Sequence, residues 1–335
     1  MFNKIYDNIK KFIKENLLSI GILILVYAVC NIEFPYYINA PGNVINLHDR
    51  VSITSSYSTN DNMYMASVSE IKGIIPTLLW ALIDKNQDIV KKEEIVYNNE
   101  TYEEANLRMR IMLNDSMNSA KIVAFRAANK KYEIVNSKVY VTLIDEHADT
   151  NLKIGDEIIS IENKSISDIT DVKTLVDNYN NDDIVNILVK RDDKEITCTA
   201  KIFTLENKKY IGISALKEYE VNTEPEVKFS FKSSESGPSG GLMLSLAIYN
   251  SLVEEDITDG KKIVGTGTID ADGNVGAIGG VKYKIAAAVK AKADLFLVPS
   301  DNYEEAKEVV EKHNYKIKLI SVSTFDEAID KLSKN

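Results

Sequence analysis

The chain has 335 residues, of which 44% are hydrophobic and 27% are charged, and its formal net charge is −10. These values are typical of a globular protein and exclude a disordered chain, a collagen-like fibre and a polytopic membrane protein. An acidic chain without a basic stripe is not expected to bind nucleic acid. Cys30 and Cys198 are the only cysteines and the three histidines lie far apart, so we expect no disulfide framework, metal or other cofactor.

An uncharged apolar run, LLSIGILILVYAV, occupies residues 17–29 and is followed by Phe34, Pro35 and Tyr36. Lysines at positions 4, 10, 11 and 14 precede it, which places the N-terminus in the cytoplasm. The pattern predicts a basic cytoplasmic segment over 1–16, a transmembrane anchor over 17–35 and an extracytoplasmic remainder at the cell membrane. Because the run is short for a spanning helix, a cleaved signal peptide is the alternative, and a buried soluble helix is a weaker one.

In the N-terminal part over 36–130, residues 43–130 alternate short apolar and polar runs, with a strand expected over 63–68 and helices over 76–84 and 103–128. The longest of these has apolar residues at three- and four-residue steps, which is typical of a helix packed on a core. We expect this N-terminal α/β part to pack with the C-terminal part of the chain. A separate domain is the alternative.

Residues 131–205 contain a strand over 139–144, a helix over 168–179 and further strands over 183–191 and 195–203. The pattern L-x-x-G-D-x-I, at Leu152, Gly155, Asp156 and Ile158, resembles that of PDZ domains in exported bacterial proteases. The resemblance implies that C-terminal peptides bind by strand addition, between the 139–144 strand and the 168–179 helix. The residues implied are Val139, Tyr140 and Val141. A structural spacer is the alternative.

Ten of the fifteen glycines fall between Gly237 and Gly280. Within this segment, the sequence Gly237-Pro238-Ser239-Gly240-Gly241 stands between a predicted strand and an apolar helix over 242–253. Ser239 is therefore expected at a helix start, where unpaired backbone N–H groups and the positive end of the dipole meet. Such a position offers a nucleophilic hydroxyl beside donors for an oxyanion, among them the N–H of Gly240.

A second motif, GTGTIDADGNVGAIGGVKYK, occupies residues 265–284 and leads into another helix. Asp272-Gly273 predicts a hairpin turn. Lys282 is expected in the first turn of the helix, where the dipole disfavours a cation and lowers its pKa. A neutral lysine can accept the proton of a serine, so the pattern favours a Ser239–Lys282 dyad. Lys284 is the rival base, on another face of the same helix.

The combination G-P-S-G-G, then G-T-G, then D-G-x-V-x-x-I-G-G-V-K-x-K resembles the proteolytic domain of the Lon family over about 227–299. With the N-terminal run and the PDZ-like unit, the chain is similar to membrane-anchored, PDZ-containing Lon-like proteases. The resemblance implies an α+β proteolytic domain over 206–335 with an inserted PDZ-like domain and one transmembrane helix. It assigns the nucleophile to Ser239, the general base to Lys282 and positioning roles to Gly240 and Thr266.

The expected function is an ATP-independent, membrane-anchored serine endopeptidase that cleaves unfolded or membrane-tethered proteins. No G-x-x-x-x-G-K-[ST] motif for ATP is found. A catalytically inert PDZ scaffold that binds peptides at the cell surface is the alternative. Phosphate binding by the glycine-rich turns is weaker, because only Lys232 and Lys262 would serve it.

Overall fold

The computed structural model describes residues 2–54, 57, 62–97 and 100–334. Positions 1 and 335, which belong to the predicted segments 1–16 and 206–335, lie outside the described residues. The chain divides into two compact units, one of Met1–Pro41 and Val68–Ile95 and the other of Gly42–Ser67 and Val96–Asn335. Strands β1 (Glu33–Asn46) and β3 (Met63–Ile74) run through both units.

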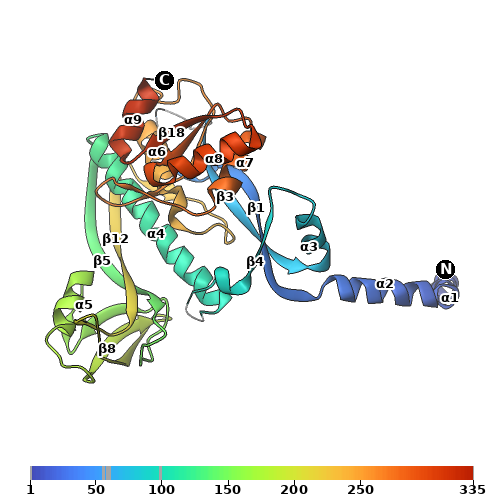
Figure 1. Cartoon of the computed structure of the whole chain (residues 1–335), viewed down its shortest axis with the longest axis horizontal. Helices are drawn as coiled ribbons and strands as arrows, with labels where there is room; N and C mark the ends of the chain where they lie inside the picture. Colours follow the sequence, from blue (N-terminus) through green and yellow to red (C-terminus); the bar gives the residue numbers. More distant parts are fainter. Residues whose placement is uncertain (1, 55–56, 58–61, 98–99, 335) are drawn as a thin grey trace. The chain divides into compact units, whose positions relative to one another are not determined.

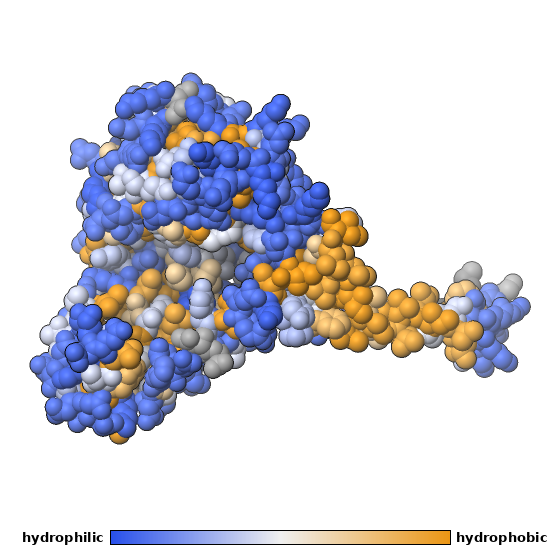
Figure 2. Space-filling model, in the orientation of Figure 1, coloured by the Kyte–Doolittle hydropathy of each residue, from blue (hydrophilic) through white to orange (hydrophobic). Residues whose placement is uncertain are grey.

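The first unit begins with two helices, α1 (Phe2–Glu15) and α2 (Leu17–Cys30), and α2 coincides with the predicted apolar run. No residue of α2 is buried, and Figure 2 shows its apolar surface. Among the described residues, no single helix is both long and apolar enough to cross a membrane. Residues Ile5–Glu15 and α2 meet the length and composition needed only as a pair, with a bend of 73° between them.

The rest of the first unit consists of parts of β1 and β3, with α3 (Ile75–Ala81) and β4 (Asp88–Lys91) after them. β4 pairs antiparallel with β1, so that Tyr36 lies opposite Lys91. Helix α3 has Pro76 in its first turn, where a missing backbone N–H costs nothing. It ends at Ala81, three residues before the predicted end.

The sheet order β18-β17-β14-β3-β1-β4 connects strands that are far apart in sequence. In the second unit, β14 (Ile263–Gly265) lies between β3 and β17 (Leu295–Pro299), and β18 (Lys318–Val322) follows, all in parallel. Successive side chains along these strands belong to different hydrophobic clusters. Ile263 and Leu295 belong to one hydrophobic cluster, and Val264 and Phe296 to another. The sheet is therefore buried on both faces, as parallel sheets are.

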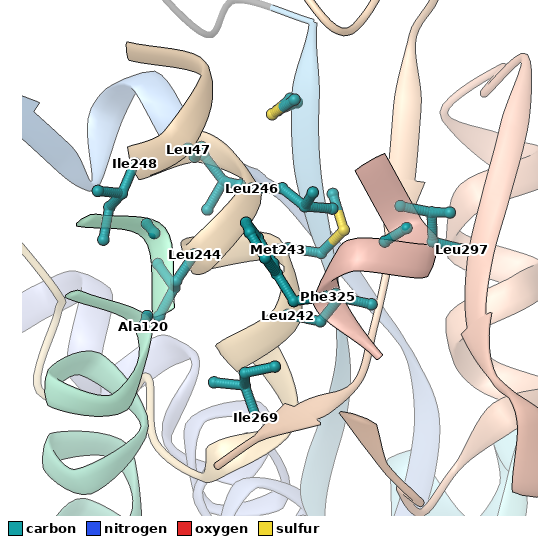
Figure 3. Close-up of a cluster of buried hydrophobic side chains, with 14 of the residues drawn as sticks. Leu47, Ala120, Leu242, Met243, Leu244, Leu246, Ile248, Ile269, Leu297 and Phe325 are labelled. Atoms are coloured by element: carbon teal, nitrogen blue, oxygen red, sulfur yellow. The ribbon is translucent and has the colours of Figure 1, made fainter. Parts of the chain in front are cut away.

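Helices supply the partners of both faces (Figure 1). Residues of α4 (Tyr102–Ala127), α6 (Gly241–Leu252) and α9 (Phe325–Ser333) join the first cluster, which is centred on α6 (Figure 3). Residues of α7 (Val281–Lys290) and α8 (Tyr303–His313) join the second. Helices thus cover both faces of the four parallel strands, while β4 pairs antiparallel with β1 at the other edge, so the fold mixes helices with parallel and antiparallel strands.

A second sheet of this unit has the order β12-β5-β6-β8-β9. The chain enters this second sheet through β5, directly after α4, and leaves it through β12, directly before β13. The second sheet is therefore inserted between two segments of the chain that both contribute to the first hydrophobic cluster. Its core contains Val139, Ile158 and Ile187, with Val172 and Leu175 of α5 packed on it. Its elements are β5 (Lys131–Ile144), β6 (Glu157–Ile161), β7 (Lys164–Ser165), α5 (Ile169–Val176), β8 (Ile184–Arg191), β9 (Lys194–Lys201) and β12 (Ile213–Glu224).

Short strand pairs complete the second unit. β13 (Val227–Phe229) pairs with β2 (Val51–Ile53), and β15 (Thr268–Ile269) pairs with β16 (Val275–Gly276) across the predicted Asp272-Gly273 turn. β10 (Phe203–Leu205) pairs with β11 (Lys208–Tyr210). The described 3-10 turns are η1 (Leu47–Asp49), η2 (Lys92–Glu94), η3 (Pro238–Gly240) and η4 (Ser300–Asn302).

Candidate active site

Ser239 lies in η3, the short turn that leads directly into α6, as the glycine-rich motif predicts. The turn is entered through Gly237, whose φ of +93° is a conformation that side chains other than glycine's disfavour. The N–H of Gly237 donates to the Met109 carbonyl at 2.9 Å, so α4 holds the start of the turn. Ser239 itself is half-buried.

Two carbonyl groups of the turn are held from opposite sides. The hydroxyl of Ser116, on α4, donates to the Pro238 carbonyl at 3.1 Å. The Ser239 carbonyl accepts from the N–H of Gly267 at 2.8 Å and from the hydroxyl of Thr266 at 3.0 Å. The peptide unit before Ser239 is thereby hydrogen-bonded to α4, and the peptide unit after it is hydrogen-bonded to the Gly265-Thr266-Gly267 segment.

Thr266 connects this turn to a buried lysine. Lys284 Nζ lies 3.1 Å from Thr266 Oγ1, and only 3% of Lys284 is exposed. Burial lowers the pKa of Lys284 to about 8, because a desolvated ammonium group is disfavoured. The hydrogen bonds therefore run from the Lys284 amine to Thr266 and from Thr266 to the Ser239 backbone.

Comparison with known families bears directly on this arrangement. The family model of the Lon protease (S16) C-terminal proteolytic domain matches residues 232–334, which include Ser239, Thr266 and Lys284. Residues 232–334 are a Lon-type proteolytic domain. A PDZ domain model matches residues 116–202.

Lon proteases of two organisms match this chain over short stretches. A Lon protease of Campylobacter jejuni is 33% identical over 97 residues, covering 29% of this chain and 12% of that protein. One from Aster yellows witches'-broom phytoplasma is 28% identical over 144 residues, covering 42% of this chain and 17% of that protein. The chain thus spans less than a fifth of the length of these relatives.

The PDZ domain has a counterpart among solved structures. The PDZ domain of an SdrC-like protein from Listeria monocytogenes is 21% identical to the matched part of this chain. The match covers 25% of this chain and 93% of that one, with a TM-score of 0.23.

The two lysines of the Lon-type domain's V-K-Y-K segment occupy different environments. Lys282, the predicted base, is half-buried, with its Nζ 5.6 Å from the centre of the Tyr283 ring. Lys284 is the lysine that contacts Thr266, and its connection to Ser239 runs through that hydroxyl. Through Thr266, the structure therefore connects Lys284 to the turn that carries Ser239.

A periodic signal in the sequence distinguishes the two lysines. Val281, Ile285 and Ala288, at steps of four and three, are all fully buried on α7. Lys284 lies three residues after Val281 and so shares this inward stripe, whereas Lys282 does not. The prediction of Lys282 relied on its position in the first turn of the helix and did not use this stripe.

The predicted peptide groove of the PDZ domain needs correction. Val139 and Val141 are fully buried core residues, and Tyr140 lies between them on β5. β5 pairs with β12 along one edge, where Tyr140 faces Leu216, and with β6 along the other, where Tyr140 faces Glu157. Since both edges are occupied, a peptide cannot add to β5 as a strand. The edge strand that contacts α5 is β12, with Lys217 Nζ 2.7 Å from Asp168 Oδ2.

Acidic side chains with raised pKa values lie near the middle of the α4 helix. Burial and the neighbouring Asp270 raise the pKa of Asp115 to about 6. Burial first, and then Asp115, raise the pKa of Glu218 on β12 to about 7. Beside Glu218 lies a cavity of about 280 Å³, which is lined also by Asn118, Lys121, Lys138, Tyr219, Glu220 and Val221. Among the described residues, no three His, Cys, Asp or Glu side chains gather as a metal site would require.

Proposed function

We propose that the chain is a membrane-anchored serine endopeptidase in which Ser239 is the nucleophile and Lys284 the general base. The Lon-type proteolytic domain supports the protease class. The buried amine of Lys284 is hydrogen-bonded to the Thr266 hydroxyl, which in turn donates to the Ser239 carbonyl, and this arrangement supports Lys284 as the base. This single observation carries the proposal.

The proposed reaction begins with proton transfer from the Ser239 hydroxyl to the neutral Lys284 amine. The serine oxygen attacks the carbonyl carbon of the scissile peptide bond. The C–N bond breaks, and the Lys284 ammonium group returns its proton to the leaving amine. Water then hydrolyses the resulting ester, with Lys284 accepting one proton of the water and Ser239 leaving as the hydroxyl.

The oxyanion of the tetrahedral intermediate needs preorganised donors. The backbone N–H groups of Ser239 and Gly240 lie in the first turn before α6, where helix geometry provides them with no carbonyl three or four residues earlier. The hydrogen bonds from Ser116 and Gly267 to the neighbouring carbonyls fix the orientation of these peptide units. We assign the oxyanion site to this turn.

The segment α1–α2 serves in this proposal as the anchor, with the lysine-rich N-terminus in the cytoplasm and the two catalytic groups outside it. Substrates would be unfolded or membrane-tethered protein segments, cleaved without ATP. The PDZ domain would bind peptide ends, at an edge other than β5. The apolar α2, none of whose residues is buried, supports the anchor.

Three single variants test the dyad in the full chain. With a fluorescently labelled unfolded protein as substrate, Ser239→Ala and Lys284→Ala should each reduce kcat/KM at least about 10³-fold. Lys282→Ala is the matched control, because it removes a lysine from the same helix, and it should retain activity. Loss of activity in Lys282→Ala with retention in Lys284→Ala would reverse the assignment. Equal activity in Ser239→Ala and the unmodified chain would refute the proposal.

A further inference from the structure

Helix α3 and the residues after it present an exposed apolar surface in the first unit. Residues 74–83 read IIPTLLWALI and contain no charged side chain. Leu79 is 58% exposed, Trp80 60%, and Leu82 and Ile83 74% each. Four large apolar side chains exposed so close together are unusual for water-facing surface and mark a contact site.

This surface lies beside the end of α2. β1 begins at Glu33, three residues after α2 ends, and Glu33 Oε1 lies 2.8 Å from Lys72 Nζ of β3. One residue further, a Cβ built on Gly73 would lie 2.6 Å from the Tyr36 carbonyl oxygen, so the two backbones touch there. Helix α3 starts two residues after Gly73. The first turn of α3 therefore lies close to the residues that follow α2 in the chain.

The two helices form one continuous apolar surface. α2 and α3 contact each other within the first unit. The side chains of α2 are as exposed as those of α3, with Leu18 79% and Leu23 68% exposed. Figure 2 shows the apolar surface passing from α2 to the α3 region without a hydrophilic break. Side chains that share one surface require the same surroundings.

We propose that α3 and residues Leu82 and Ile83 insert into the interfacial layer of the bilayer, beside the point where α2 leaves it. This inference rests on the proposed anchoring by α2. The occupant is lipid because the surface continues that of α2 and because tryptophan, in the middle of an uncharged segment, is enriched at the membrane interface. Asp84 and Lys85 follow directly, as expected where the chain returns to water.

Trp80 is the only tryptophan of the chain, so its fluorescence reports on α3 alone. The full chain is reconstituted into phosphatidylcholine vesicles that contain lipids brominated either near the headgroup or near the end of the acyl chain. We expect the bromine near the headgroup to quench Trp80 more strongly than the deep bromine. Acrylamide in the water should quench it weakly, and emission should shift to the blue relative to the unfolded chain.

A pair of variants locates the effect. Leu79→Ser combined with Ile83→Ser keeps Trp80 as the reporter, and should lose most of the bromolipid quenching. Leu205→Ser is the matched control, because Leu205 is also 58% exposed but belongs to β10 in the second unit. It should leave the quenching unchanged. Circular dichroism of each variant checks that the fold is retained.

The outcomes separate this inference from the anchor on which it rests. A chain that does not float with the vesicles refutes the anchor itself. A chain that floats while Trp80 is open to acrylamide and untouched by bromolipids retains the anchor and overturns the interfacial role of α3. Protection of Trp80 from both quenchers also overturns it, since a protein surface, such as a second copy, would then cover α3.

Discussion

The Lys284 amine and the Thr266 hydroxyl lie 3.1 Å apart in an interior from which water is nearly excluded, since Thr266 is fully buried and Lys284 is 3% exposed. Burial is the cause of the lowered pKa of Lys284. The same hydroxyl donates to the carbonyl of Ser239. One threonine thus joins the group that can accept a proton to the turn that carries the nucleophile.

The first prediction concerns the pH dependence of the rate. Only the neutral amine can accept the Ser239 proton, and the pKa of Lys284 is lowered to about 8. Below pH 8, kcat/KM should therefore rise about tenfold per pH unit, and it should level off above that value. The measurement is kcat/KM of the full chain between about pH 6 and about pH 10. A profile that is flat between about pH 6 and about pH 8 would exclude Lys284 as the base.

The second prediction concerns stability. Because the folded pKa of Lys284, about 8, is below the unfolded value of 10.5, the unfolded chain binds more protons between these pH values. The penalty of burying the charged lysine is fully present below pH 8 and disappears as the pH rises toward 10.5. Lys284→Met should accordingly raise the free energy of unfolding at about pH 7 by up to about 3 kcal/mol.

Denaturant unfolding in detergent measures this effect in a Ser239→Ala background, which prevents self-cleavage. The gain from Lys284→Met should shrink when the measurement is repeated near about pH 10. Lys282→Met serves as the control and should show no comparable gain at either pH. A gain of the same size at both pH values would mean that packing, rather than the charge, is responsible.

Local patterns in the sequence predicted most of the Lon-type domain. The apolar run after Gly241, the Asp272-Gly273 turn and the helix after Gly280 are encoded by neighbouring residues, and each lies where it was expected. To choose between Lys282 and Lys284 as the base, one must know which face of α7 points into the protein. That face follows from the periodicity of buried residues, which is a weaker signal than a motif.

Longer-range pairing was not accessible in the same way. The 139–144 strand was identified, but its partner β12 lies much later in the chain, at Ile213–Glu224. No local signal shows that this segment occupies the edge that the predicted peptide needs. The ion pair of Asp156 with Arg191 was missed for the same reason, although the motif that contains Asp156 was identified.

The third prediction compares two adjacent glycines of the nucleophile turn. A Cβ at Gly240 would lie 2.7 Å from the sulfur of Met65, which a flexible side chain can withdraw. A Cβ at Gly241 would lie 2.5 Å from Ser116 Oγ and 3.0 Å from the backbone nitrogen of Ile269. Gly240→Ala should therefore retain activity.

Gly241→Ala should instead lose stability by about 1–3 kcal/mol, the usual cost of overpacking, and lose activity as Ser116 is pushed from the Pro238 carbonyl. Thermal unfolding and kcat/KM of both variants make the comparison. Equal behaviour of the two alanines would show that the packing around Gly241 does not hold the turn.

The fourth prediction concerns the charge pair inside the PDZ domain. Asp156 is fully buried and receives hydrogen bonds from Arg191 Nε and Nη2 at 2.6 Å each, and from the Lys153 N–H at 2.8 Å. The Arg191 side chain is 20% exposed. Removing the arginine leaves a carboxylate without access to water, whereas removing the aspartate leaves a guanidinium that still reaches it. Arg191→Met should therefore cost more than Asp156→Asn, about 3–5 kcal/mol.

Hydrogen exchange of the β6 and β8 amides in a Ser239→Ala background separates this local effect from global unfolding. Arg191→Met should accelerate exchange in these two strands, which Asp156 and Arg191 connect, and leave the amides of α6 protected. Combining Arg191→Met with Asp156→Leu removes both charges and should recover much of the lost protection, because an apolar pair of similar volume can replace a buried ion pair. A double variant no more protected than Arg191→Met alone would show that the guanidinium supports the domain through its contact with the Asn151 carbonyl, at 3.2 Å, rather than by neutralising Asp156.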